Sequence, residues 1–181
     1  MSYDATITRL PIFALFDLKG PQSALTGWAG STLPDFPTAA NTRSGGPGDL
    51  LAHIGPDHWL LCAEPGREDM LEAALRPGDA PPEISIVKIS DSLCFFRITG
   101  PDAAQVLSIG CPLDPHIASF PENGASFTEV FGIKAFVTRC GGGFDCAVDQ
   151  SYADMIAACF DRALADPGLP VEIDAMADID D

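Results

Sequence analysis

Short apolar stretches separated by glycine and proline turns dominate the first part of the chain. Residues 12–18 are apolar enough for a buried strand, and Gly20-Pro21 ends this strand and begins a short helix that reaches about residue 30. Residues 33–48 then contain three prolines and three glycines, a composition that sustains neither a helix nor a sheet ladder. We expect a long surface loop there.

A hairpin and an amphipathic helix follow this loop. Residues 50–54 and 58–63 flank a Gly-Pro-Asp tripeptide, whose proline fixes φ and whose aspartate can bond back to the backbone. The helix expected at 67–76 groups apolar side chains on one face, namely Met70, Leu71, Ala74 and Leu75. Residues 77–83, PGDAPPE, are the best candidate for a linker between two halves.

The pattern after the linker predicts the same kinds of element. Strands are expected at 84–89 and 93–99, a helix at 101–109, and a proline-punctuated loop at 111–124. Three more strands follow, with turns at Gly132 and at Gly141-Gly142-Gly143: residues 127–131, 133–139 and 144–148. The last of these alternates apolar residues with Asp145 and Asp149.

The final helix has the clearest periodicity in the chain. Ser151 is its expected N-cap, with Asp154 three residues further on. Its apolar positions recur at helical spacing: Tyr152, Met155, Ile156, Cys159, Phe160, Ala163 and Leu164. After Pro167 the acidic tail is expected to fray, although Val171 and Ile173 are able to add an edge strand.

Two segments of the first half recur in the second half in the same order. LFDLKGPQSALTGWAG (15–30) aligns with FFRITGPDAAQVLSIG (95–110), and WLLCAEPGREDMLEAAL (59–75) aligns with FDCAVDQSYADMIAACF (144–160). The offsets are 80 and 85 residues. The shared order and the nearly equal offsets favour duplication of an α+β half over coincidence.

We therefore predict an α+β fold of two pseudo-repeated halves, each with antiparallel strands and helices packed on one face. A single unit is expected over 10–166, with halves at 10–76 and 84–166 joined by the linker 77–83. A polar lead-in precedes it at 1–9, and an acidic tail follows at 167–181. At 181 residues and 46% hydrophobic content, the chain is long enough to bury a full core of its own.

Acidic residues greatly outnumber basic ones. The chain has 26 Asp and Glu against 10 Lys and Arg, which gives a formal net charge of −16. Such a surface repels phosphate backbones and anionic lipid, so we expect neither nucleic acid nor a membrane as a partner. A solvated acidic surface is favoured over an acidic recognition face.

The cysteines and histidines lack the spacing of metal ligands. No Cys-x-x-Cys occurs, and His53, His58 and His116 have no neighbouring Cys or His at ligand spacing. Five of the six cysteines lie in apolar strand or helix patterns, which is typical of reduced core residues. The chain starts without an apolar signal segment and has no uninterrupted apolar stretch of about 18 residues, so we expect a soluble cytoplasmic protein.

Several short motifs follow one another in order along residues 9–165. They are LPIFALFDLKG, the GPDHWLL stretch, VKISDSLCFFRITGPDAAQVLSIGCPLD and GGFDCAVDQSYADMIAACFDRAL. In this order and spacing they resemble the gamma subunit of heterotetrameric sarcosine oxidase. No single motif is chemically diagnostic, so the resemblance depends on the combination.

The resemblance implies the fold of the folate-binding domain of glycine-cleavage aminomethyltransferases, reduced to its core. It also implies a subunit of a complex that oxidatively demethylates sarcosine to glycine and passes the one-carbon unit to tetrahydrofolate. FAD, FMN, NAD and tetrahydrofolate are then expected in the partner alpha, beta and delta subunits, and none of them on this chain. The N-methyl amino acid that is oxidised stays open, because relatives also occur in N-methylglutamate dehydrogenase complexes.

The aminomethyltransferases that the chain resembles carry a one-carbon-transferring aspartate on the strand before the ITGPDAA-like segment. Residues 87–92 place Lys88 or Ile89 at that position, depending on a one-residue gap. Asp91 is nearby, but a slip of one position in a strand turns a side chain to the opposite face. We therefore assign no catalytic, cofactor-binding or metal-binding residue to the chain.

Two clusters of polar residues have structural explanations that we favour. Asp57 and His58 are adjacent, and a turn-stabilising aspartate is a better explanation than an acid–base pair. Asp114 and His116 lie near Cys111, but a triplet within one loop is weak evidence for Cys-His chemistry.

Glycines and aromatic residues offer two further candidates. Gly141-Gly142-Gly143 precedes a strand rather than a helix, so a hairpin turn is favoured over a phosphate cradle. Four aromatic residues are able to stack on a pterin, although packing between the halves is the favoured explanation: Trp28, Trp59, Phe95 and Phe96.

Two functions are consistent with these observations. The first is a non-catalytic, cofactor-free subunit that packs against larger flavoprotein chains, with the proline-rich loops 33–48 and 111–123 as its expected contact surface. The second is a stand-alone folate-dependent aminomethyltransferase or folate-binding protein, which rests on fold analogy alone. The sequence leaves open whether the isolated chain forms homodimers.

Overall fold

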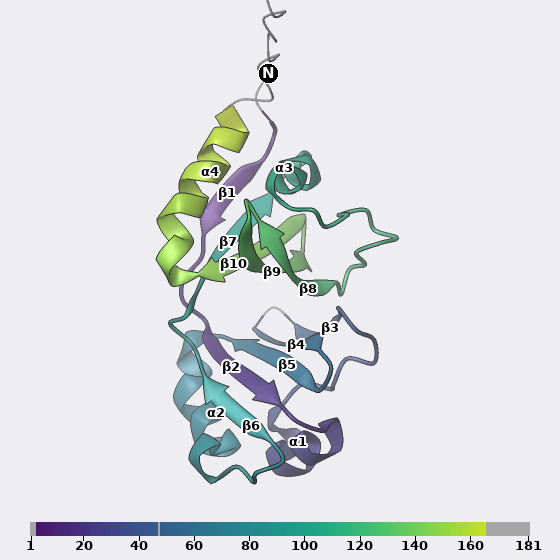
Figure 1. Ribbon diagram of the computed structural model, residues 1–181, viewed down its shortest axis with the longest axis vertical. Coiled ribbons are helices and arrows are strands. Elements are labelled where there is room, and N and C mark those ends of the chain that lie inside the picture. Colours follow the sequence, from purple (N-terminus) through teal and green to yellow (C-terminus); the bar gives the residue numbers. More distant parts are fainter. Residues whose placement is uncertain (1–2, 47, 166–181) are drawn as a thin grey trace, which may run out of the picture.

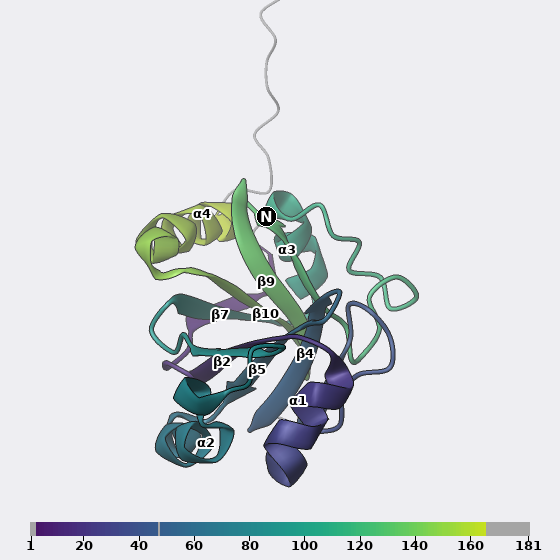
Figure 2. The same ribbon diagram turned by 60° about the horizontal axis from the view of Figure 1, so that its bottom comes forward.

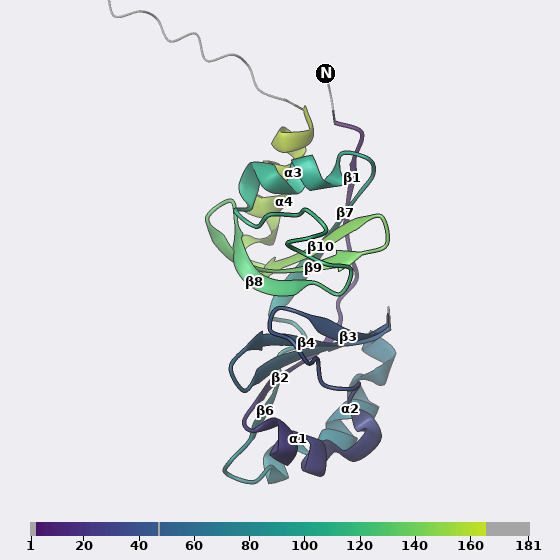
Figure 3. The ribbon, with the colours of Figure 1, turned by 90° about the vertical axis from the view of Figure 1, so that its right-hand side faces the viewer.

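Two five-stranded antiparallel sheets lie face to face, and each carries two helices on its outer face (Figure 1). The computed structural model describes residues 3–46 and 48–165. The first sheet has the strand order β3-β4-β5-β2-β6, and the second sheet has the order β8-β9-β10-β7-β1. Seen from the side, the molecule is a stack of helices, sheet, sheet and helices (Figure 3).

Apart from β1, each sheet and its helices come from one continuous part of the chain. The first sheet and its helices are β2 (Ala14–Lys19), α1 (Gln22–Ala29), β3 (Arg43–Gly46), β4 (Asp49–Gly55), β5 (His58–Ala63), α2 (Glu68–Leu75) and β6 (Ser85–Lys88). The second sheet and its helices are β1 (Thr6–Arg9), β7 (Leu93–Thr99), α3 (Ala103–Gly110), β8 (Ala125–Val130), β9 (Ile133–Cys140), β10 (Gly143–Asp149) and α4 (Ala153–Ala165). Figure 2 shows α1 and α2 next to each other on the first sheet.

The two sheets share one pairing register, displaced by the offsets of the sequence repeat. Phe16 pairs with Leu61 between β2 and β5, and Phe96 pairs with Cys146 between β7 and β10, which lie 80 and 85 residues further along. All six pairs of β2 with β5 have a counterpart at these same offsets. The prediction of an α+β fold with two pseudo-repeated halves is confirmed.

The first strand of each half lies in the sheet of the other half. β1 pairs with β7, and β6, the first strand after the predicted linker 77–83, pairs with β2. The chain therefore crosses between the sheets twice, and Figure 1 shows the first crossing as the purple ribbon that runs from β1 to β2. Residues 6–9, expected to be part of a polar lead-in, thus form a sheet strand.

Three apolar layers hold the stack together. One outer layer lies beneath α3 and α4, the other lies beneath α1 and α2, and an inner layer lies between the sheets. The inner layer contains Leu15, Ala52, Leu60, Cys62, Phe95, Ala125, Phe136 and Ala147. Because both faces of β10 are covered, Asp145 is only 8% exposed, and the alternation along this strand does not place it at the surface.

Several local predictions are wrong in detail. Residues 43–46, expected in a loop, form β3 and pair with β4, because the backbone hydrogen bonds of a ladder do not require large side chains. Asp149, rather than Ser151, provides the cap before α4, since its carboxylate accepts hydrogen bonds from the backbone N–H (2.8 Å) and hydroxyl (2.5 Å) of Ser151.

Three side chains expected on apolar helix faces are exposed. Met70 on α2 is 48% exposed, and Tyr152 and Met155 beside and on α4 are each 43% exposed. The predicted acidic tail, with Val171 and Ile173, lies outside the described residues. In the part of the chain that the structure describes, no helix is both long enough and apolar enough to cross a membrane.

Candidate functional site

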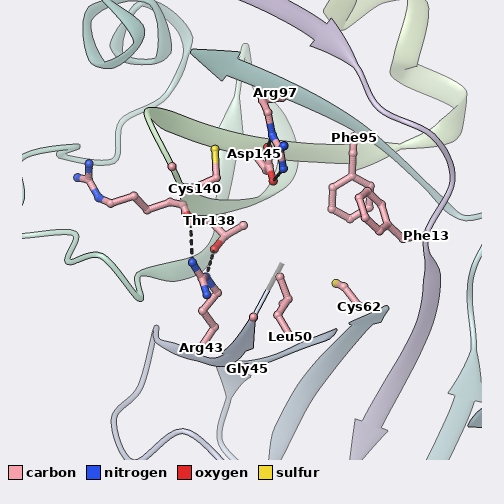
Figure 4. A pocket seen from close by; sticks show the side chains of 13 residues that line it. Phe13, Arg43, Gly45, Leu50, Cys62, Phe95, Arg97, Thr138, Cys140 and Asp145 are labelled. Carbon is pink, nitrogen blue, oxygen red and sulfur yellow. Dashed lines mark hydrogen bonds and ion pairs between the residues drawn. The ribbon is translucent and has the colours of Figure 1, made fainter. Parts of the chain in front are cut away.

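A cleft of about 390 Å³ opens between the two sheets beside the inner apolar layer (Figure 4). One wall is apolar, with Phe13 before β2, Leu50 on β4 and Phe95 on β7. The other wall is polar, and its side chains come from strands of both sheets: Arg43, Arg97, Thr138, Cys140 and Asp145. A cavity of this size with a few convergent polar groups is the usual form of a small-molecule site.

Arg97 and Asp145 form the central ion pair of the cleft. They face each other across β7 and β10, and Nε and one Nη of Arg97 each donate to a different carboxylate oxygen at 2.7 Å. The hydrogen bonds with Asp145 raise the pKa of the Arg97 guanidinium, against the opposing effect of burial. Each carboxylate oxygen of Asp145 thus accepts one hydrogen bond from this guanidinium.

Arg43 bridges the two sheets at the mouth of the cleft. From β3 its Nε donates to the hydroxyl of Thr138 at 3.1 Å, and one Nη donates to the carbonyl of Arg139 at 3.0 Å, both on β9. Among the described residues, no carboxylate forms an ion pair with Arg43. Its positive charge is therefore not neutralised by a partner within this part of the chain.

The two thiols of the cleft are neutral at physiological pH. Burial, followed by the nearby Asp145 carboxylate, raises the pKa of Cys140 to about 11. Burial also raises the pKa of Cys62 far above its usual range. Because the thiolate is the reactive form of cysteine, neither residue is an activated nucleophile.

Asp57 and His58 do not act on each other in the structure. Asp57 has a positive φ of 50°, and its carbonyl accepts a hydrogen bond from the backbone N–H of Gly20 at 2.9 Å. The Nε2 atom of His58 contacts the carboxylate of Asp17 on the neighbouring strand, which also pairs with Lys19 at 3.0 Å. Asp57 thus lies in the turn with its backbone carbonyl bonded to Gly20, and the histidine belongs to a separate polar cluster.

The loop after α3 does not assemble a Cys-His pair. Asp114 accepts from the backbone N–H of His116 at 2.9 Å and from the hydroxyl of Ser119 at 2.6 Å, and these bonds, that of Ser119 first, lower its pKa. The Nδ1 atom of His116 accepts from the backbone N–H of Ala118 at 3.2 Å. The Cys111 thiol is buried, which raises its pKa.

The four candidate aromatic residues do not converge on one site. Phe95 alone lies in the inner layer, where its ring centroid is 4.7 Å from that of Phe13. Trp28 and Trp59 pack in the outer layer beneath α1 and α2, and Phe96 packs in the outer layer of the second sheet. The expectation of packing between the halves is thus wrong for these three, because Trp59 and Phe96 lie at strand positions that face the helices and Trp28 lies on α1 itself.

The positions expected for the transfer aspartate also point away from acid chemistry. Lys88 pairs with Glu72 at 2.5 Å and with Glu68 at 3.6 Å on α2. Ile89 packs against the inner apolar layer, and Asp91 is exposed in the following turn. Gly141 and Gly142 form the turn between β9 and β10, as the hairpin interpretation predicts.

Sequence reasoning missed Arg43, Arg97 and Asp145 as members of one site. The available signal was a charged residue inside an otherwise apolar strand, as Arg97 is in FFRIT and Asp145 is in FDCAV. Such a charge is rarely buried unless it is paired. Arg43 gave no comparable signal, since it lies in a stretch whose composition predicts a loop.

Comparisons of the sequence with known proteins indicate one kind of relative. No family model matches the chain. The chain is 34% identical over 96 residues to sarcosine oxidase subunit gamma of Corynebacterium sp. (strain U-96), a match that covers 52% of this chain and 45% of that subunit. It is 27% identical over 119 residues to the gamma subunit of Arthrobacter sp., covering 66% and 57%. The chain thus spans about half the length of the curated relatives it matches.

Comparisons of the fold agree with those of the sequence. A chain of the heterotetrameric sarcosine oxidase from Corynebacterium sp. U-96, in complex with pyrrole 2-carboxylate, superposes with a TM-score of 0.76 at 26% identity, covering 89% of this chain and 84% of that chain. Aminomethyltransferase T of the glycine cleavage system from Bartonella henselae has a TM-score of 0.63 at 18% identity, covering 88% and 46%, which shows a shared fold alone. The predicted resemblance to sarcosine oxidase gamma subunits and to the aminomethyltransferase fold is confirmed.

Proposed function

We propose that this chain is the gamma-type subunit of a heterotetrameric sarcosine oxidase-type complex, in which it contributes structure and assembly rather than catalysis. The observation that carries the proposal is the agreement of sequence and fold on one kind of protein, since a chain of such a complex superposes on 89% of the residues. Similarity of fold alone would be weak evidence for this function, because the same fold serves other functions.

The chemistry of the described residues supports a non-catalytic role. The position of the transfer aspartate holds Lys88, which is paired with Glu72 and Glu68 on α2, or Ile89, which has no titratable group. The carboxylate in the cleft is held by both oxygens on Arg97. Because these residues do not form a convergent set of free titratable groups, the observations favour a role in binding partner subunits over a role in catalysis.

The proposal extends to the whole complex. Its alpha, beta and delta subunits would bind FAD, FMN, NAD and tetrahydrofolate and would demethylate sarcosine to glycine. Its location would be the cytoplasm, which is consistent with the six cysteines, all of which are free thiols in the structure.

The surface proposed to contact these partners is formed by two loops that meet. The backbone N–H of Arg43 donates to the carbonyl of Asn123 at 2.8 Å, and that of Ala125 donates to the carbonyl of Asn41 at 3.0 Å. Both loops project from the same side of the molecule (Figures 1 and 3). Ile117 in the second loop is 48% exposed, so this surface has apolar area to bury against another chain.

Co-expression tests the proposal directly. The tagged chain would be expressed with the flavoprotein chains encoded beside its gene and purified by affinity and size exclusion. We expect one stoichiometric complex with flavin absorbance and sarcosine-dependent turnover. A complex that assembles and turns over fully without this chain, while the chain elutes alone, would overturn the proposal.

A titration of the isolated chain with tetrahydrofolate tests the alternative. The fold shared with aminomethyltransferase T is the observation behind a folate-binding function. Micromolar affinity would favour that function over a purely structural subunit. Size exclusion of the same sample also shows whether the isolated chain forms homodimers through the surface proposed for its partners.

A further inference from the structure

The internal repeat gives positions of the cleft an equivalent in the other half of the fold. On the cleft side, Gly45 of β3 pairs with Leu50 of β4. The same register in the second sheet pairs Phe127 of β8 with Phe136 of β9, whose ring centroids lie 5.5 Å apart. Two aromatic rings therefore occupy the place that corresponds to a glycine and a leucine in the cleft.

Asp145 and Arg43 of the cleft have apolar equivalents, whereas Arg97 corresponds in register to Asp17. Asp145 on β10 pairs with Thr138 on β9, whereas the equivalent Leu60 on β5 pairs with Ala52 on β4. Arg43 corresponds in register to Ala125, which is fully buried. The duplicated fold thus has apolar side chains at the places equivalent to Asp145 and Arg43, so the fold itself does not require these two charges.

The charge of the cleft is opposite to that of the chain. The protein has a net charge of −16, yet three of its 10 basic residues, Arg43, Arg97 and Arg139, line the cleft with a single carboxylate, that of Asp145. The guanidinium of Arg139 donates to the carbonyls of Phe120 and Pro115, which leaves Arg43 and Arg97 as the candidate ligands. Each arginine uses Nε and a single Nη in the hydrogen bonds found among the described residues, which leaves its other Nη available. An arginine presents its donors as a fork that matches the two oxygens of a carboxylate.

The apolar wall of the cleft indicates what the uncharged part of a ligand would be. Phe13 and Phe95 meet edge to face, and Leu50 lies opposite them on the first sheet (Figure 4). We propose that the cleft binds a small organic carboxylate, whose apolar or aromatic body lies against Phe13, Phe95 and Leu50 and whose charged group is held by Arg43 and Arg97. This site is independent of the proposed role in assembly, and it goes beyond the sequence-based expectation, which assigned no binding residue to the chain.

Calorimetric titration of the full chain with benzoate and benzamide tests this proposal. The two probes have similar shapes, and only benzoate carries the negative charge. We expect saturable binding of benzoate, with benzamide at least about tenfold weaker, as for the loss of one charge-assisted hydrogen-bonded pair. Equal affinity for both probes, or no saturable binding of benzoate, would overturn the proposal.

Three variants locate the binding within the cleft. Arg43→Met is expected to weaken benzoate binding about tenfold or more, whereas Arg76→Met, at an exposed arginine that lies over the ring of Trp28, leaves it unchanged. Leu50→Phe introduces the side chain found at the equivalent Phe136, so it fills the cleft, keeps both arginines and abolishes binding.

Asp145→Asn provides a test in the opposite direction. The variant removes the carboxylate that competes for Arg97, so benzoate affinity is expected to rise about tenfold. A misfolded variant could not bind more tightly, which separates this outcome from a loss of structure. Unchanged affinity in Leu50→Phe, or weaker binding in a folded Asp145→Asn protein, would contradict the assignment.

Discussion

The ion pair in the cleft predicts an unequal cost for removing its two partners. In Arg97→Met the carboxylate of Asp145 stays behind with a side chain that is only 12% exposed. In Asp145→Asn the guanidinium of Arg97 stays behind, and its side chain is 43% exposed. The free energy of unfolding should therefore fall much more in the first variant, because it leaves an unpaired charge that is largely removed from water.

The magnitudes follow from the geometry of the pair. Two unit charges about 4 Å apart attract by about 4 kcal/mol at an effective dielectric constant of about 20, and the exposure of Arg97 reduces this through solvent screening. We expect Arg97→Met to cost about 3 kcal/mol, as for a buried ion pair that loses one partner. Asp145→Asn should cost about 1 kcal/mol, since the exposed guanidinium turns to water. The double variant should cost about 2 kcal/mol, which is less than the sum of the single changes.

Urea denaturation of the wild-type chain and the three variants measures these differences in one double-mutant cycle. Equal costs for the single variants would refute the reasoning, as would a larger cost for Asp145→Asn. Additive costs would show that the two side chains do not stabilise each other.

Three further predictions concern the turns, the thiols and the proposed contact surface. A Cβ on Gly143 would lie 1.9 Å from the carbonyl oxygen of Ile98, so Gly143→Ala should cost about 2 kcal/mol or more in urea denaturation, whereas Gly141→Ala, with open space around it, should change stability by less than about 0.5 kcal/mol. Because the pKa of Cys140 is raised to about 11, its rate of alkylation by iodoacetamide, followed by peptide mass spectrometry, should keep rising with pH through 9 and 10; a plateau near pH 8 would contradict this. Ile117→Glu should prevent co-purification with the flavoprotein chains while leaving the chain folded, whereas Ile109→Glu, at an equally exposed isoleucine on α3, should not; equal effects would show that the loop is not the contact surface.

The repeat could be predicted because it is visible in the amino-acid sequence itself. A strand, a Gly-Pro turn and a helix recur at offsets of 80 and 85 residues, and the pairing register of the sheets preserves both offsets. The pairing of β1 and β6 with the sheet of the opposite half is not visible in the sequence in this way. The strand at 6–9 is four residues long, largely polar and paired with residues about 90 positions away, and local periodicity carries no information about so distant a partner.

The cleft could not be predicted from the sequence for a related reason. Arg43, Arg97 and Asp145 come from β3, β7 and β10: the pairing of β7 with β10 places Arg97 beside Asp145, and the stacking of one sheet on the other brings Arg43 to them. The sequence could show that a charge lies within an apolar strand, but not which charge lies opposite. Likewise, the helical periodicity of Met155 indicates an apolar position, but the extent of the sheet beneath α4 decides whether that position is covered.

Because β1 and β6 each pair in the sheet of the opposite half, the polypeptide cannot be divided into two complete halves. A cut within residues 77–83 would leave each fragment with a short strand that has lost its partner and a sheet that has lost its closing edge. The two fragments would complete each other only by reassociating, as the protomers of a domain-swapped dimer do. An ancestral chain of a single half would have met the same requirement by pairing with its own copy, and gene fusion would then have joined a swapped homodimer into one molecule.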